Sequence, residues 1–179
     1  METKNKPKRQ RIKEGDVVAI KLTDGRYVFG REFEYGLGVY DFVADSKDNP
    51  PNNVNRFLFI VGVYRDVITS GEWPKVGNDN SISNNSPKNH MGFTIDLING
   101  NYELYEYVSG SSSPSSIDEC YGLERVAAWD AEQIVLRIEE MLNKSKPTLL
   151  KDQNWIPDIL EVDANGNIYK RIKFEDWTH

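Results

Sequence analysis

Hydrophobic and polar residues alternate along the first third of the chain, as they do in β-strands with one buried face. In the run IKEGDVVAIKLTDGRYVFGREF, residues 12 to 33, two such segments flank the dipeptide Asp24-Gly25. An Asp-Gly pair in this position predicts a two-residue type I′ hairpin turn, which needs positive φ at both central residues. Gly30 lies inside the second segment and indicates a bulge or a close backbone approach. We expect a bent hairpin here.

Six further segments carry strand patterns. They are residues 39–43, 57–64, 91–97, 102–105, 159–162 and 168–174. The segment 57–64, FLFIVGVY, is nearly all apolar and therefore predicts a central strand that is buried on both faces. Asn99-Gly100 and Asn165-Gly166 predict the turns of two more hairpins.

The segments between these strands are less regular. Residues 44–55 form a polar loop, and Val67-Ile68 predicts a short extension of the sheet. Residues 69–90 predict a turn followed by a long Asn/Ser-rich loop. The run SGSSSPSS, residues 109–116, predicts a flexible connector. Residues 117–128 fit either a short helix or an irregular packing segment.

One amphipathic helix is predicted over residues 130–143. Its apolar residues recur at helical spacing and form a single stripe. Asp130 and Gln133 make a capping box at its start, with Trp129 as a hydrophobic staple. Arg137 lies opposite the apolar stripe or at its edge, where it would pair with an acid that the sequence does not specify. The pattern predicts an α+β fold: a strongly bent antiparallel sheet, or a partly open SH3-like barrel, packed by one main helix.

Charge is unevenly distributed. Residues 1 to 13 carry six Lys or Arg against one acid, so the rest holds 16 basic and 27 acidic residues, a net charge of −11. We expect a basic disordered arm over residues 1–11, dispensable for folding, and a single α+β domain over residues 12–179. The acidic body suits a basic protein partner and makes a nucleic-acid partner unlikely on charge grounds.

No apolar run approaches the roughly 20 residues of a membrane span, and no apolar region follows the basic start of the chain. We therefore expect no membrane association and no secretory signal. A lone cysteine, Cys120, excludes an internal disulfide and favours the cytoplasm.

The sequence offers little for catalysis. His90 and His179 lack carboxylates or thiols at metal-ligand spacing, and Cys120 has acidic neighbours that would raise its pKa. Four aspartates fit turns or an exposed strand face, where carboxylates are usually solvated. They are Asp16, Asp24, Asp41 and Asp45. We expect a protein that is not an enzyme and binds no cofactor or metal.

The run Gly15-Asp16-Val17-Val18-Ala19-Ile20, followed by Asp24-Gly25-Arg26-Tyr27-Val28-Phe29-Gly30-Arg31, resembles the opening of the immunity protein 26 (Imm26) family. The similarity continues through the aromatic strands near Tyr40 and Phe59 to Trp129-Asp130 and Arg137, which covers most of residues 12 to 145. The resemblance implies an immunity protein of a bacterial polymorphic toxin system. Such a protein binds a cognate toxin domain and occludes its active site, without chemistry of its own.

Many toxins of such systems act on nucleic acids through basic surfaces, so the resemblance suggests an acidic patch that covers a basic cleft, as in a nuclease. The candidate partner-binding residues lie in and beside two loops that leave the sheet. They are Asp41, Asp45, Asp48, Glu72 and Trp73. Trp73 has two readings: it is an exposed interface anchor, or it folds back to cap one end of the sheet.

Two rival functions remain. One is a nucleic-acid-binding module that uses an SH3-like sheet and the basic arm, although the arm has no aromatic residue to stack on bases. The other is a metal-independent hydrolase with paired carboxylates, although the chain has no recognisable nucleophile and base set.

Overall fold

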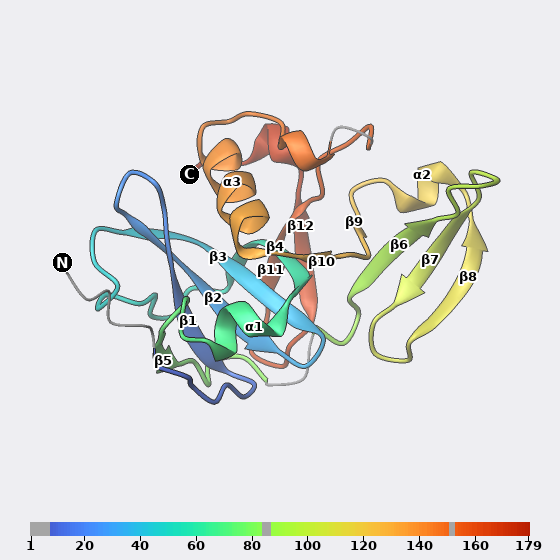
Figure 1. The fold of residues 1–179 in the computed structure, drawn as a ribbon. Coiled ribbons are helices and arrows are strands. Elements are labelled where there is room, and N and C mark those ends of the chain that lie inside the picture. Colours follow the sequence, from blue (N-terminus) through green and yellow to red (C-terminus); the bar gives the residue numbers. More distant parts are fainter. Residues whose placement is uncertain (1–7, 84–86, 151–152) are drawn as a thin grey trace.

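The computed structural model describes residues 8–83, 87–150 and 153–179, which form two β-sheets (Figure 1). The larger sheet has eight strands in the order β12-β11-β4-β3-β2-β1-β5, with β10 paired to β4 off this path. Its pairs are antiparallel except β10 with β4. The strands are β1 (Asp16–Lys21), β2 (Tyr27–Phe33), β3 (Gly36–Ala44), β4 (Arg56–Val63), β5 (Lys75–Asn78), β10 (Ala128–Trp129), β11 (Ile159–Val162) and β12 (Ile168–Ile172).

The larger sheet is bent by bulges in its central strands. The pairing of β2 with β3 shifts register between Val28 and Gly30, and that of β3 with β4 shifts between Val39 and Tyr40. A Cβ atom on Gly30 would lie 2.8 Å from the Leu37 side chain, closer than packed atoms allow. The bulge predicted at Gly30 is confirmed. The sheet bends strongly but does not close into a barrel, so the predicted α+β class is also confirmed.

Apolar side chains cover both faces of the larger sheet. On one face, Phe59 and Val61 of β4 pack in a core with the helix α3 (Ala131–Leu142). On the other face, Phe57 and Ile60 join a second core. These residues of β4 are at most 2% exposed, which confirms the prediction of a central strand buried on both sides.

The helix α3 follows its sequence signals closely. The Asp130 side chain accepts a hydrogen bond from the Gln133 N–H at 2.9 Å, and the Gln133 side chain accepts one from the Asp130 N–H at 3.1 Å. This capping box was predicted. The residues Ile134, Ile138 and Met141 are fully buried against the sheet. The other helices are α1 (Arg65–Thr69), α2 (Ile117–Cys120) and the 3₁₀ turns η1 (Thr148–Leu150) and η2 (Phe174–Asp176).

The first hairpin turn differs from the predicted type I′ turn. Gly25 has a φ of 92°, but Asp24 is not in the positive-φ region. The Gly25 N–H donates to the Leu22 carbonyl at 3.1 Å, and the Leu22 N–H donates to the Arg26 carbonyl at 2.9 Å. This is a three-residue loop, in which a type I turn is followed by a left-handed glycine. Such a loop needs only one positive φ, and Asp24 instead accepts a hydrogen bond from the Arg26 N–H.

Three predictions for the segments between the strands are wrong. The loop predicted over residues 69–90 contains the strand β5, which pairs with β1. Val67 and Ile68 lie in α1 and not in a strand, because one helical turn directs both side chains into the main core. The segment predicted as a flexible connector contains the strand β8 (Ser111–Ser115), which pairs with β7 (Tyr102–Glu106). A β-ladder is made by backbone groups, so the small polar side chains of this segment do not prevent it.

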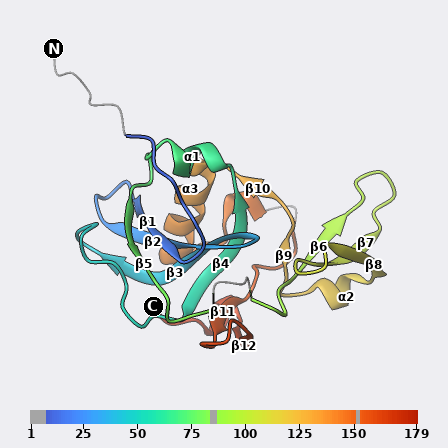
Figure 2. The same ribbon diagram turned by 90° about the horizontal axis from the view of Figure 1, so that it is seen from below.

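The smaller sheet has the order β8-β7-β6-β9, where β6 is Met91–Ile95 and β9 is Glu124–Arg125. It stands to one side of the larger sheet in both views (Figures 1 and 2). Its own small core contains Phe93, Cys120 and Trp155. Cys120 is fully buried, as expected of a packing residue, and burial raises the pKa of its thiol.

The predicted arm lies partly outside the described residues, which begin at Lys8. At its end, the Gln10 side-chain amide donates hydrogen bonds to the carbonyl oxygens of Ile68 (2.8 Å) and Trp73 (2.7 Å). Its amide oxygen accepts a bond from the Lys75 N–H at 2.9 Å. Gln10 therefore joins α1 to β5. No helix in the described residues is long and apolar enough to cross a membrane.

Candidate functional site

The five candidate residues occupy three different environments. Asp41 was expected on an exposed face, but its side chain is fully buried. It accepts bonds from Arg56 at 2.6 Å and from the Trp177 indole N–H at 2.8 Å, and lies 3.0 Å from His179. The C-terminal residues Trp177 and His179 cover this position. Asp41 therefore anchors the C-terminus to the sheet.

Asp45 and Asp48 are exposed in the loop between β3 and β4. Glu72 is exposed after α1, whereas Trp73 is 3% exposed and packs in the main core. Because β3 and β4 are antiparallel, their C-terminal ends lie at opposite ends of the sheet. The chain after α1 returns beside β1, however, where the Ala19 N–H donates to the Pro74 carbonyl at 3.0 Å.

This return places Glu72 and Trp73 at a groove along α3, which we call the α3 groove. It has a volume of about 380 Å³. Its apolar floor consists of Trp73, Ala131, Val135 and Leu136. Its polar rim consists of Lys21, Thr23, Glu72, Glu132 and Glu139. An apolar centre with a polar rim is the usual anatomy of a protein interface.

The walls of the α3 groove are fixed relative to each other. The Glu139 carboxylate on α3 accepts hydrogen bonds from the Thr23 N–H at 2.6 Å and the Thr23 hydroxyl at 2.7 Å. Leu136 is 42% exposed, so its side chain is open to a partner. A groove with fixed walls loses little conformational entropy when a partner binds.

One of the exposed loop acids, Asp45, lies near the same groove. Lys21 on its rim is paired with Tyr27, and Tyr27 is paired with Ala44, the residue before Asp45. Two strand spacings separate Lys21 from Ala44, which is about 10 Å. The strand pairing therefore places Asp45 on the same side of the sheet edge as Lys21, near the α3 groove.

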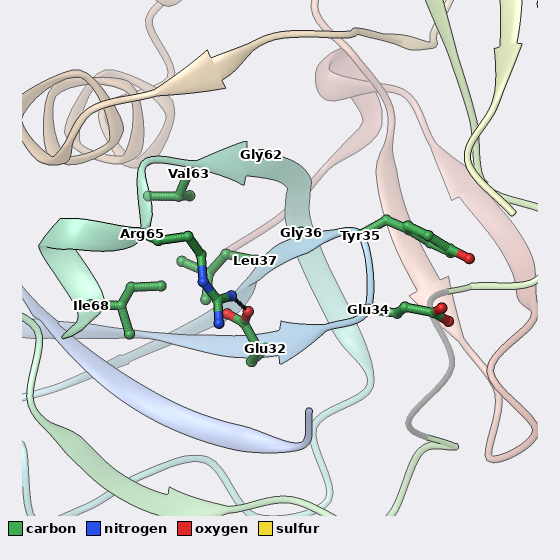
Figure 3. Close-up of a pocket in the computed structure, with 9 residues that line it drawn as sticks. All are labelled: Glu32, Glu34, Tyr35, Gly36, Leu37, Gly62, Val63, Arg65 and Ile68. Carbon is green, nitrogen blue, oxygen red and sulfur yellow. Dashed lines mark hydrogen bonds and ion pairs between the residues drawn. The ribbon is translucent and has the colours of Figure 1, made fainter. Parts of the chain in front are cut away.

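A second hollow, of about 210 Å³, lies at the turn between β2 and β3 (Figure 3). Its carboxylate, Glu32, is 5% exposed and forms an ion pair with Arg65. A Cβ atom on Gly36 would lie 2.7 Å from the Val61 carbonyl oxygen, so the close approach of β4 requires glycine at this position. The ion pair satisfies the charge of Glu32, and this hollow offers no apolar floor comparable to that of the α3 groove.

A basic groove of about 480 Å³ lies beside β12 and the C-terminus. Its cationic residues are Arg56, Lys170, Arg171 and Lys173. Arg56 is already paired with Asp41 at 2.6 Å and Lys170 with Glu161 at 3.5 Å. Two of the four positive charges are therefore partly neutralised within the chain.

The buried titratable groups are held by structural contacts. Asp16, expected to be solvated, is fully buried and bonds to Lys75 at 2.7 Å and Asn78 at 3.0 Å. Burial acts to raise the pKa of Asp16, but these hydrogen bonds outweigh it and hold the pKa below its usual value. In the described part of the chain, no three His, Cys, Asp or Glu side chains converge as metal ligands do.

His90 is buried and stacks on Tyr107 with ring centres 4.3 Å apart. Burial, together with the positive charge of Arg171, lowers the pKa of His90 to about 3. The ring is therefore neutral at physiological pH and is too weak a base for general-base catalysis. These contacts agree with the structural role expected of His90.

The sequence reading missed the contribution of α3 to the candidate surface. Val135 is one of the apolar residues at helical spacing that predict a buried stripe, yet it is only partly buried and lines the α3 groove. Leu136 lies off that stripe. An apolar residue on the polar face of a helix is a signal, readable in the sequence, that this face contacts another surface. From the sequence alone, Glu132 and Glu139 cannot be distinguished from other solvent-exposed charges on a helix.

Comparison with known proteins gives one family match. A model of the family described as immunity protein 26 (Imm26) matches residues 13–104, just over half of the 179 residues. The match begins just before β1 and ends within β7, so it does not test the resemblance noted over residues 105–145. No curated protein and no solved structure gives a match. By this match, the chain belongs to the immunity protein 26 family.

Proposed function

We propose that this protein protects the cell that makes it by binding a cognate toxin domain of a bacterial polymorphic toxin system. It acts in the cytoplasm, where it occludes the active site of the toxin and performs no chemistry itself. Membership of the immunity protein 26 family supports a toxin partner. The single structural observation that carries the proposed binding surface is the α3 groove, with its apolar floor and a polar rim on which three glutamates outnumber one lysine.

Charge supports a basic partner. Outside residues 1 to 13, acids exceed bases by 11, and Glu72, Glu132 and Glu139 concentrate negative charge at the α3 groove. Asp45 and Asp48 extend this charge outward from the groove. A nuclease that binds its substrate through a basic cleft fits such a surface, because the acids mimic the phosphates that the cleft recognises.

Binding kinetics with the toxin domain encoded next to this gene would test the proposal. The exposed acids act over long range, so Asp45→Lys with Asp48→Lys should lower the association rate and weaken its salt dependence. Leu136→Gln keeps helix propensity but removes an apolar contact. It should raise the dissociation rate by roughly 10-fold or more, as expected of a residue near the centre of an interface.

The matched control reverses two exposed acids elsewhere. Glu175→Lys with Asp176→Lys changes net charge by the same amount in η2, and should leave both rates near those of the wild type. Trp73→Ala would not isolate the loss of a contact with the toxin, because the Trp73 side chain is part of the core and its truncation would also destabilise the fold. If Leu136→Gln and the Asp45/Asp48 variant bind as the wild type does, the interface lies elsewhere. If the wild type does not bind the toxin domain, the proposed function is wrong.

The basic groove makes nucleic-acid binding the second candidate function. Fluorescence anisotropy with labelled RNA and DNA oligonucleotides would test it. We expect only weak, salt-sensitive binding, because two cations of the groove are already paired with acids. Tight binding that is lost in Arg171→Gln with Lys173→Gln would favour this alternative over toxin binding.

A further inference from the structure

Two neighbouring aliphatic side chains project from the loop between β6 and β7. Leu97 is 81% exposed and Ile98 is 98% exposed. Single exposed apolar residues are common on protein surfaces, but adjacent ones at the tip of a loop form a contiguous apolar feature. The loop lies at the end of the smaller sheet that is far from the larger sheet (Figures 1 and 2).

The tip is held in one shape by its own hydrogen bonds. The Gly100 N–H donates to the Asp96 carbonyl at 2.7 Å, and the Asp96 N–H donates to the Asn101 carbonyl at 2.9 Å. The Asp96 side chain also accepts a bond from the Ile98 N–H at 2.8 Å. A loop fixed in this way keeps both aliphatic side chains outward and loses little entropy on binding.

The surrounding segment, residues 91–124, has six acidic residues and no lysine or arginine. We call it the acidic lobe. One acid, Glu124, is buried in an ion pair with Arg137. The other acids of the lobe are Asp96, Glu103, Glu106, Asp118 and Glu119. The apolar tip therefore belongs to a lobe whose charged side chains are all negative.

From this combination we propose that Leu97 and Ile98 form an apolar plug that inserts into an apolar socket on a basic protein. This inference rests on the proposed function and commits to the cognate toxin domain as that protein. A second copy of the chain would bring two acidic lobes together, and like charges at an interface oppose association. An anionic membrane surface would repel the lobe in the same way.

The free edge of the smaller sheet does not offer an alternative mode of contact. Pro114 belongs to β8, which is an edge strand of this sheet, and lies opposite Glu103 of β7. Proline has no N–H and within sheets occurs on edge strands with that side facing solvent, where it blocks the addition of another strand. The contact that we propose is therefore made by side chains of the tip and not by strand pairing.

The test compares Leu97→Ser with Ile98→Ser, as a double variant, against the matched single variant Val108→Ser. Val108 is 46% exposed in the loop between β7 and β8, at the other end of the same lobe. In titrations with the toxin domain encoded beside this gene, the double variant should raise Kd by about 10- to 100-fold, mainly through faster dissociation. Val108→Ser should bind as the wild type does, and both variants should keep the wild-type melting temperature.

The outcomes separate this inference from the proposed function. Failure of the wild type to bind the toxin domain would overturn the proposed function. If the wild type binds and the folded double variant binds equally well, the plug is wrong while the toxin-binding function stands. If the double variant changes the mass in light scattering but not the toxin affinity, the tip is a contact between copies, and the inference is again overturned.

Discussion

Arg137 on α3 and Glu124 on β9 form a bidentate ion pair, with nitrogen to oxygen distances of 3.0 and 2.7 Å. The Arg137 side chain is fully buried and that of Glu124 is 5% exposed. The guanidinium also lies 4.0 Å above the centre of the Phe59 ring in β4. This pair therefore ties the helix, the larger sheet and the acidic lobe together, and it orients the lobe that carries the apolar tip.

Removing one partner of this pair should cost much more than removing an exposed pair. Arg137→Met leaves a buried carboxylate without its counter-charge, so we expect a loss of about 3–5 kcal/mol in the free energy of unfolding. Urea denaturation followed by fluorescence would measure it. Lys170→Met, which removes the exposed partner of Glu161, is the control and should cost less than about 1 kcal/mol.

The double variant Arg137→Met with Glu124→Leu sharpens this test. It removes both charges and replaces them with apolar groups, so it should be more stable than Arg137→Met alone. A double variant that is less stable than Arg137→Met would show that Glu124 is stabilised by groups other than Arg137.

Gly25 should tolerate substitution worse than Gly77, although both have open space where a Cβ atom would lie. Gly25 has a φ of 92°, whereas Gly77 is not among the positive-φ residues. Gly25→Val should therefore lower the unfolding free energy by roughly 1–3 kcal/mol through backbone strain. Thermal unfolding of Gly25→Val beside Gly77→Val would measure the difference, and equal losses would contradict the three-residue turn.

His90 should make stability fall between pH 7 and pH 5. Its folded pKa is lowered to about 3, so in this range only the unfolded chain takes up a proton at this position. The stability contribution is present above pH 6.5 and is lost as pH falls toward 3. From an unfolded pKa near 6.5, the loss by pH 5 is about 2 kcal/mol.

His90→Phe tests this pH dependence. Phenylalanine keeps a ring to stack on Tyr107 and does not titrate. The variant should show a flatter dependence of melting temperature on pH over this range, where the lowered pKa values of Asp16 and Asp79 keep both carboxylates ionised. A slope identical to that of the wild type would mean that His90 is already accessible to protons in the folded state.

Truncation of the N-terminus should lower the stability of the protein. From composition alone, a chain starting at Ile12 is expected to keep its melting temperature. The three hydrogen bonds of Gln10 to Ile68, Trp73 and Lys75 change this expectation. Removal of residues 1–11 should cost about 1–3 kcal/mol, because three backbone groups, two of them partly buried, lose their hydrogen-bond partners.

Gln10→Ala in the full chain should reproduce most of that loss, as seen in thermal or urea unfolding. Lys8→Ala is the matched control, since Lys8 is exposed. Unchanged stability in both Gln10→Ala and the truncation would place this side chain in solvent.

The sequence by itself determined the features that depend on near neighbours. Alternation at period two fixed the strands on either side of Gly25 and Gly166, and apolar residues on one side of a helical turn fixed α3. The capping box of Asp130 with Gln133 was also readable, because both partners lie within one turn. These signals come from backbone geometry and local hydrogen bonds, which act over a few residues.

Only the tertiary structure decided which side chains meet across the chain. Asp41 has the sequence pattern of a solvated strand residue, yet Trp177 and His179 return from 136 and 138 positions away to cover it. The sequence also did not predict the partner of Arg137, the edge strand β8 or the position of Leu136 in the α3 groove. Burial and pairing of charges depend on which segments the fold brings together, and two identical carboxylates are solvated or buried according to that arrangement alone.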